Sequence, residues 1–268
     1  MNFVVALPAE AKPIINHLGL TKQHLPSPFA LFGDKTYQLV VSGIGKQNIA
    51  HAVSFLHGRK TCQNTPWLNV GLAGHGNAAT GEAFQIAKYT DQQNEKTGYP
   101  PQIFSTPLHK TFLKTCNQPS SEYHSNTAYD MEGSAFFESA YRYSTTELVQ
   151  SIKIISDNPQ NPVSHFDKSL VHSLISPQLP KILSLSEEMI RAAKKISEPT
   201  EIETLFTEII QIHTLTETQK YQIKKAIRHG RILGISISEI RQLANSEKNT
   251  KKFILNLNKK LEEKNLFS

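Results

Sequence analysis

The chain has 268 residues, of which 38% are hydrophobic, and its mean hydropathy is −0.36. This length is enough to bury the core of one or two domains, and the composition predicts a globular protein without a membrane span. The net charge of +6 is uneven, because residues 201–268 contribute +4 of it.

The N-terminal apolar run, residues 1–7, has no basic segment and leads into Pro8 and Glu10. A secretory signal needs a basic segment, so we expect a first β-strand here and a cytoplasmic protein. The two cysteines, Cys62 and Cys116, are too far apart for a CxxC motif, and the 11 histidines show no HxH or HxxxH spacing. We therefore expect no metal site and no organic cofactor.

Up to about residue 198, strand-like apolar runs alternate with helical spacing, which is typical of an α/β domain. The first elements are predicted as strands at 2–7, 37–41 and 68–72 and helices at 9–18 and 48–57. Glu10 lies at the first strand-to-helix turn. Two turns of small residues, Ser42-Gly43-Ile44-Gly45-Lys46 and the segment 71–77 containing Gly74, would let backbone amides approach a ligand closely.

The second half of this region adds a helix at 131–142, whose first turn carries Asp130 and Glu132, and a buried strand at 151–155. This strand would deliver Ser156 and Asp157 to its carboxyl end, where open α/β sheets bind their ligands. Any one of these acids taken alone is better explained as a helix cap or as a partner of the helix dipole. These acids indicate a particular chemistry only when they are considered together and in their order along the chain.

The ordered set resembles the nucleoside phosphorylase superfamily, and within it the methylthioadenosine/S-adenosylhomocysteine nucleosidases. The resemblance covers roughly residues 1–195 and rests on four stretches in the same order. These are the Glu10 turn, the Ser-Gly-Ile-Gly-Lys turn, the Gly-rich turn at 71–77, and Met131-Glu132 followed by Ser156-Asp157. It implies a three-layer α/β sandwich with a central mixed sheet over residues 1–198, and a homodimer.

The resemblance also implies roles for individual residues. Glu10 would position and activate the attacking water, Glu132 would hold the ribose hydroxyls, and Asp157 would protonate the purine at N7. Met131 would pack against the sugar and Ser156 would orient Asp157. Cleavage of an N-glycosidic bond passes through an oxocarbenium-like state, so it needs a general acid on the base and a water on the other face of the sugar.

The sequence favours water over phosphate as the nucleophile. Phosphorylases of this superfamily bind phosphate with arginines on the early turns, but Arg59 is the only arginine before Arg142. Arg59 lies at a predicted helix end, and Lys46 lacks the bidentate fork of an arginine. A phosphate-dependent phosphorylase stays open as an alternative, as does a nucleoside-binding regulatory protein without turnover.

The sequence departs from the family between residues 78 and 128, where the segment that stacks on the base is shortened. Thr106, within Phe104-Ser105-Thr106-Pro107, is a candidate for the base pocket, and the alternative is a strand end followed by a turn. Together with Ser42 and Gly74 it completes the predicted substrate-binding set. His75 is interpreted as a surface loop residue. The identity of the base and of the 5′ substituent stays open.

Residues 201–268 show only helical spacing, with helices predicted at 203–212, 216–229, 236–244 and 249–263 and a capping box at Ser236-Ile237-Ser238-Glu239. A small all-helical module follows, joined through residues 197–200. Its basic segment at 220–231 is compatible with nucleic acid, but a solvated basic helix face is the commoner explanation. We expect it to pack against protein instead.

Overall fold

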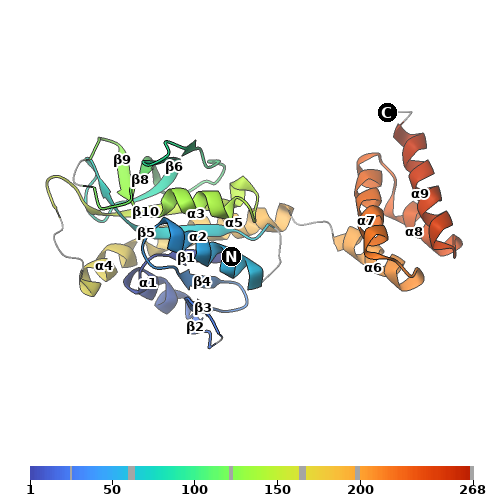
Figure 1. Ribbon diagram of the computed structural model, residues 1–268, viewed down its shortest axis with the longest axis horizontal. Coiled ribbons are helices and arrows are strands. Elements are labelled where there is room, and N and C mark those ends of the chain that lie inside the picture. Colours follow the sequence, from blue (N-terminus) through green and yellow to red (C-terminus); the bar gives the residue numbers. More distant parts are fainter. Residues whose placement is uncertain (25, 60–63, 121–122, 163–166, 197–199, 266–268) are drawn as a thin grey trace. The chain divides into compact units, whose positions relative to one another are not determined.

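A computed structural model describes residues 1–24, 26–59, 64–120, 123–162, 167–196 and 200–265. The chain forms two compact units, Met1–Ile196 and Ser197–Ser268, each with its own hydrophobic core (Figure 1). The predicted junction at 197–200 lies, except for Thr200, outside the described residues.

The first unit is built on one mixed sheet. Its strands are β1 (Asn2–Val5), β2 (Thr21–Lys22), β3 (Ala30–Gly33), β4 (Gln38–Val41), β5 (Trp67–His75), β6 (Ala83–Asp91), β7 (Thr97–Gly98), β8 (His109–Thr115), β9 (Thr127–Asp130) and β10 (Val149–Asp157). Its helices are α1 (Pro8–Leu18), α2 (Lys46–Arg59), α3 (Gly133–Ala140), α4 (Lys168–Ile175) and α5 (Leu179–Ile196), with short 3-10 turns at Thr146–Leu148 and Ser176–Gln178.

The long strand β5 organises the sheet. It pairs in parallel with β1 and with β10, and its last two residues pair with β9 in antiparallel fashion. β10 pairs with β6, β6 with β8, and β8 with β9. Because β5 pairs with both β9 and β10, these five strands form a closed ring. The carboxyl ends of β1, β4, β5 and β10 therefore gather at one edge, where open α/β sheets bind their ligands.

Helices cover both faces of the sheet, because alternate residues of a strand point to opposite sides. Phe3 and Val5 of β1 join a core with α1, α4 and α5, whereas Val4 joins a second core with α2 and α3. Trp67, 1% exposed, belongs to the second core. The three-layer sandwich with a central mixed sheet is thus confirmed.

Two of the differences from the predicted element boundaries concern residues of the candidate site. The segment 71–77, predicted as a turn, is strand up to His75, because β5 continues to pair with β10 and β9 through its small residues. Asp130, predicted in the first turn of a helix, is the last residue of β9, and α3 begins only at Gly133. Pairing with β8 holds Asp130 in the sheet.

The second unit consists of helices α6 (Thr200–Ile212), α7 (Glu217–Ile232), α8 (Ile237–Ser246) and α9 (Thr250–Asn265) (Figure 1). All four lie where helical spacing predicted them. The capping box at Ser236 is confirmed, since its hydroxyl accepts from Glu239 N at 3.2 Å while Glu239 Oε2 accepts from Ser236 N at 2.8 Å. Within the described part of the chain, no helix is long and apolar enough to cross a bilayer.

Candidate active site

Glu10 projects from the first turn of α1 and is 4% exposed. Its Oε2 accepts from the backbone N–H groups of Ala6 (3.1 Å) and Leu7 (2.8 Å), and its Oε1 accepts from Leu72 N on β5 (2.9 Å). Burial nevertheless raises the pKa of the Glu10 carboxyl above its usual value, because the backbone donors only partly offset desolvation. A carboxylate has about four acceptor positions, so one stays available for the proton of a water.

Lys153 lies beside Glu10 in the middle of β10, where the sequence predicted only a buried strand. Its Nζ is 2.8 Å from Asp130 Oδ2, and both side chains are almost fully buried, at 2% and 1% exposure. A methyl group added at Gly71 would meet both Glu10 Oε1 and Lys153 Nζ, at 3.2 and 3.6 Å. The ammonium group therefore neutralises part of the charge that the acids of this cluster bring into the interior.

Glu132 stands between β9 and α3, with its Oε1 accepting from Gly45 N at 2.6 Å. It is 8% exposed, and burial together with the nearby charge of Asp130 raises the pKa of Glu132 to about 7. The positive charge of Lys153 lowers the pKa of Glu132 and so offsets part of this rise. Glu10, Asp130 and Glu132 thus share one buried ammonium group.

Asp157 ends β10 next to a bulge. Ile155 pairs with Ala73 and Asp157 pairs with Gly74, so Ser156 is one residue more than β5 can match. Bulges of this kind re-aim a side chain at the end of a strand. Ser156 Oγ lies 2.5 Å from Asp157 Oδ1, and the Tyr123 hydroxyl donates to Asp157 Oδ2, also at 2.5 Å.

Two glycines of β5, Gly71 and Gly74, and Gly76 just after it each make room for a neighbouring group of the same chain. A Cβ at Gly74 would lie 2.6 Å from the Tyr123 hydroxyl oxygen, and a Cβ at Gly76 would lie 2.1 Å from His124 O. Gly71 does the same for Glu10. The small residues that predicted close approach of a ligand therefore admit parts of the protein itself.

Ser42 and Met131 also reach this edge of the sheet. Ser42 Oγ donates to the carbonyls of Val5 (3.2 Å) and Gly43 (2.8 Å), so its hydroxyl is engaged by the backbone. Met131 borders a cavity of ≈ 390 Å³ beside the Glu132 contact. The cavity is lined by Ile44, Gly45, Lys46, Gln47, Asn48, Gln93, Asn117 and Met131.

Lys46, the alternative phosphate ligand, is already paired. Its Nζ lies 3.0 Å from Asp91 Oδ2, and Asp91 in turn accepts from Ser134 Oγ at 2.7 Å. These bonds lower the pKa of the buried Asp91 in spite of desolvation and hold the first turns of α2 and α3 against β6. Arg59 is the last residue of α2, as predicted, and its Nη2 donates to Gln23.

Thr106 is not brought to this cluster. Its hydroxyl donates to Gln85 Oε1 at 3.2 Å, and Gln85 donates to Gln150. Gln150 is in the first half of β10, seven residues before Asp157, which is about 20 Å along a strand. The segment containing Thr106 thus packs at the other end of β10, and we withdraw it from the substrate-binding set.

His75 is a buried strand residue, which corrects its interpretation as a surface loop residue. It is 2% exposed and its Nδ1 accepts from the N–H groups of Asn77 and Ala78 at 3.1 and 2.9 Å. Burial lowers the pKa of the imidazole. His75 therefore closes the turn after β5.

Three members of the cluster were missed by the sequence analysis: Lys153, Asp130 as its partner, and Tyr123. A signal for Lys153 was available, because a lysine inside an apolar strand needs a buried counter-ion. Tyr123 gave no signal, since nothing in its local sequence relates it to Asp157, 34 residues away. Among the described residues, no group of three or more His, Cys, Asp or Glu side chains could hold a metal ion.

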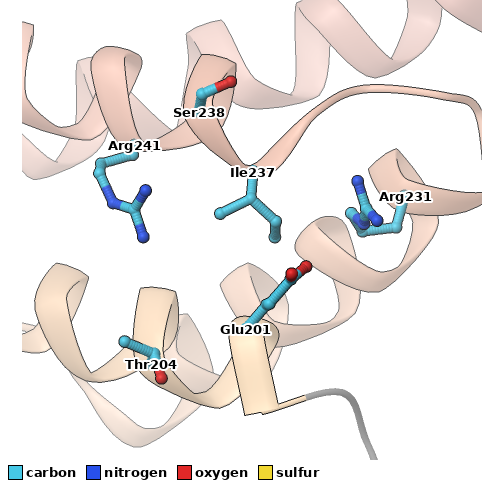
Figure 2. Close-up of a pocket in the computed structure, with 6 residues that line it drawn as sticks. All are labelled: Glu201, Thr204, Arg231, Ile237, Ser238 and Arg241. Carbon is cyan, nitrogen blue, oxygen red and sulfur yellow. The ribbon is translucent and has the colours of Figure 1, made fainter.

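A separate cavity of ≈ 500 Å³ lies within the helical unit (Figure 2). It is lined by Glu201, Thr204, Arg231, Ile237, Ser238 and Arg241. Glu201 lines it together with Arg231 and Arg241, so this cavity combines charges of both signs. Arg241 is also paired with Glu208, with Nε 2.7 Å from Oε2. The cavity presents no single-sign surface for nucleic acid.

Several solved structures that share this fold are nucleosidases. The 5′-methylthioadenosine/S-adenosylhomocysteine nucleosidase of Campylobacter jejuni matches with a TM-score of 0.55 and 17% identity, covering 69% of this chain and 97% of that one. The apo 5′-methylthioadenosine nucleosidase of Arabidopsis thaliana matches with a TM-score of 0.53 and 18% identity, covering 69% of this chain and 94% of that one. The nucleosidase of Colwellia psychrerythraea in complex with adenine matches with a TM-score of 0.53 and 14% identity, covering 70% of this chain and 93% of that one.

No protein-family model and no curated protein sequence matches the chain. The resemblance first seen in four short motifs is therefore confirmed at the level of the fold, which is that of the methylthioadenosine/S-adenosylhomocysteine nucleosidases. At these identities the likeness concerns the fold alone.

Proposed function

We propose that this protein hydrolyses the N-glycosidic bond of a purine nucleoside, with water as the nucleophile. The observation that carries the proposal is the buried cluster of Glu10, Glu132 and Lys153, with Asp157 at the carboxyl end of the strand that carries Lys153. The cluster and Asp157 together supply an acceptor for water, an acceptor for sugar hydroxyls and a carboxyl for the departing base. These are the groups that glycosidic cleavage needs.

Each group has a stated role in the reaction. Glu10 accepts a proton of the attacking water at its remaining acceptor position, and its raised pKa suits a general base. Glu132 accepts from the ribose hydroxyls and places negative charge near the developing oxocarbenium ion. Asp157 donates a proton to the base as the bond to the sugar breaks, and Ser156 orients it. Lys153 keeps Glu10 and Glu132 from repelling one another fully.

Two observations support water over phosphate. The Lys46 ammonium is paired with Asp91, and Arg59 lies at the carboxyl end of α2 beside Gln23. A phosphate would bring at least one further negative charge next to three carboxylates that share one ammonium group. The phosphorylase alternative is therefore less well supported.

The cavity beside Met131 supports a nucleoside with a 5′ substituent. It adjoins Gly45, the backbone partner of Glu132, and contains neither Asp157 nor Gly74. With the sugar hydroxyls at Glu132 and the base at Asp157, this cavity is left for the substituent. Its lining combines Ile44 and Met131 with the amides of Gln93 and Asn117, so a substituent with both apolar and polar parts, such as methylthio or homocysteinyl, fits.

The test is release of free base from 5′-methylthioadenosine, S-adenosylhomocysteine, adenosine and inosine, each with and without inorganic phosphate. We expect release without phosphate from at least one of the first two. Release only with phosphate would establish a phosphorylase and remove the role of Glu10. Binding without release would favour the regulatory alternative, with the helical unit as its output.

A further inference from the structure

The Tyr123 side chain stands where the departing base would have to lie. Its hydroxyl donates to Asp157 Oδ2 at 2.5 Å, while Asp157 Oδ1 is engaged by Ser156. Its ring lies against Gly74 so closely that a single added methyl group there would be 2.6 to 2.8 Å from ring and hydroxyl atoms. Both oxygens of the proposed general acid are therefore occupied by groups of the chain itself.

Tyr123 is held in position by contacts of its own ring and of the residues that follow it. Its ring packs against Tyr129 with centroids 5.1 Å apart, and the Tyr129 hydroxyl accepts from His124 N at 2.9 Å. Asn126 N donates to Asn77 Oδ1 at 3.0 Å, and Gly76 N donates to Thr127 O at 3.3 Å. The segment after Tyr123 is thus fastened to the end of β5, and Gly76 makes room for it.

We infer that Tyr123 is a specificity-determining residue that closes the base end of the site, and that a substrate must displace its phenol from Asp157. This inference rests on the proposed function. To protonate a base, Asp157 has to present one oxygen to a ring nitrogen, and the Tyr123 hydroxyl holds the oxygen that Ser156 leaves free. The phenol and a purine compete for one carboxyl group and for the surface above Gly74.

Displacement selects the base by its chemistry. Once the phenol has left, Asp157 takes up a proton from solvent and donates it to the base, so the base needs a basic ring nitrogen within reach of this carboxyl group. The base also has to be flat enough to cover Gly74. Purines have both features, through N7 and the fused rings. Burial and the carboxylate raise the pKa of the Tyr123 phenol, so it stays a hydrogen-bond donor across the neutral range until it is displaced.

The first experiment measures binding of free adenine to the full chain by calorimetry, with Tyr123→Phe against wild type. The variant keeps the ring and removes only the hydrogen bond to a charged group, so we expect adenine to bind about tenfold more tightly or better. Tyr123→Ala should bind at least as well. The matched control is Tyr99→Phe, since Tyr99 is 70% exposed and should leave adenine affinity unchanged.

A second measurement does not depend on a change of affinity. With 3-fluorotyrosine at position 123, saturating adenine should shift the fluorine resonance as the phenol leaves Asp157. An unchanged resonance at saturation, or equal or weaker adenine binding by Tyr123→Phe, would overturn the inference.

The same variants separate this inference from the proposed function. Tighter adenine binding by Tyr123→Phe, with no base released from any nucleoside, supports the displacement of Tyr123 and removes the nucleosidase activity. Base release with equal KM in wild type and Tyr123→Phe supports the nucleosidase activity and rules out the displacement of Tyr123.

Discussion

Lys153 Nζ lies 2.8 Å from Asp130 Oδ2 in an ion pair that is almost completely shielded from water. Asp130 is held in turn by Thr115 Oγ1 and by the backbone N–H of Gly133, each at 2.8 Å. This pair fixes the one ammonium group that Glu10 and Glu132 share.

Asp130→Asn should destabilise the first unit by about 3–5 kcal/mol, because it leaves a buried lysine without its charge partner. Chemical denaturation measures the change in the free energy of unfolding. The matched control is Glu138→Gln, which breaks the exposed pair with Lys96 (3.7 Å) and should cost less than about 1 kcal/mol. Equal effects of the two variants would contradict the role of Asp130.

The pH dependence of the stability should show the raised pKa of Glu132, which is about 7 in the folded protein. Between the usual carboxyl pKa and about pH 7 the folded state binds more protons than the unfolded state, so the contribution of Glu132 to stability falls as pH rises. Glu132→Gln should flatten this fall, measured by denaturation at several pH values. An identical pH dependence in the variant would show that Glu132 ionises normally.

The activity should depend on pH in the opposite direction. An ionised Glu132 is required to accept the ribose hydroxyls, so kcat/KM for base release should rise with pH and level off above about 7. Glu132→Gln should lose this rise along with most of the rate. A profile that is flat from pH 5 to 8 in the wild type would exclude Glu132 from the reaction.

Glu10→Gln and Asp157→Asn should each lower kcat for base release by about 10²–10⁴-fold while the fold persists. Both changes keep the shape of the side chain and remove its acid–base chemistry. Circular dichroism checks the fold, and Glu95→Gln, on the turn between β6 and β7, is the control expected to keep wild-type rates. Wild-type rates in both site variants would refute our assignment of the site.

Gly74→Ala should destabilise the protein by about 1–3 kcal/mol, since the new methyl group overlaps the Tyr123 ring and hydroxyl. Tyr123→Ala should relieve most of this cost in the double variant, and a double-mutant cycle measures the coupling. Gly58→Ala is the control, because nothing lies within 4 Å of a Cβ there and α2 should gain slightly. Additive effects at positions 74 and 123 would contradict the contact.

Ser236→Ala should weaken α8 by about 1 kcal/mol through loss of its capping box. Hydrogen exchange over residues 237–246 of the full chain would measure this as faster exchange. Base release should not change, because Ser236 is in the second unit and all the proposed site residues are in the first. Exchange in the variant that is unchanged or slower would show that the cap does not stabilise α8.

Much of the fold could be predicted from local patterns. The alternation of apolar runs and helical spacing placed the first strand, the helix carrying Glu10 and the four helices of the second unit within a few residues. The errors lie where sheet pairing overrode local chemistry. The Gly-rich segment continues as β5 because β10 and β9 pair with it, and Asp130 stays in β9 because β8 does.

The sequence by itself determined the α/β class, the two units, and which acids stand at strand ends, because periodicity, caps and motif order are local properties of the chain. Only the tertiary structure decided what those acids meet. Lys153 neutralises a cluster assembled from α1, β9, β10 and the residue before α3. Tyr123 covers Asp157, and Thr106 lies at the far end of β10. Such contacts join residues tens of positions apart, and they exist only once burial and strand pairing have fixed the register of the sheet.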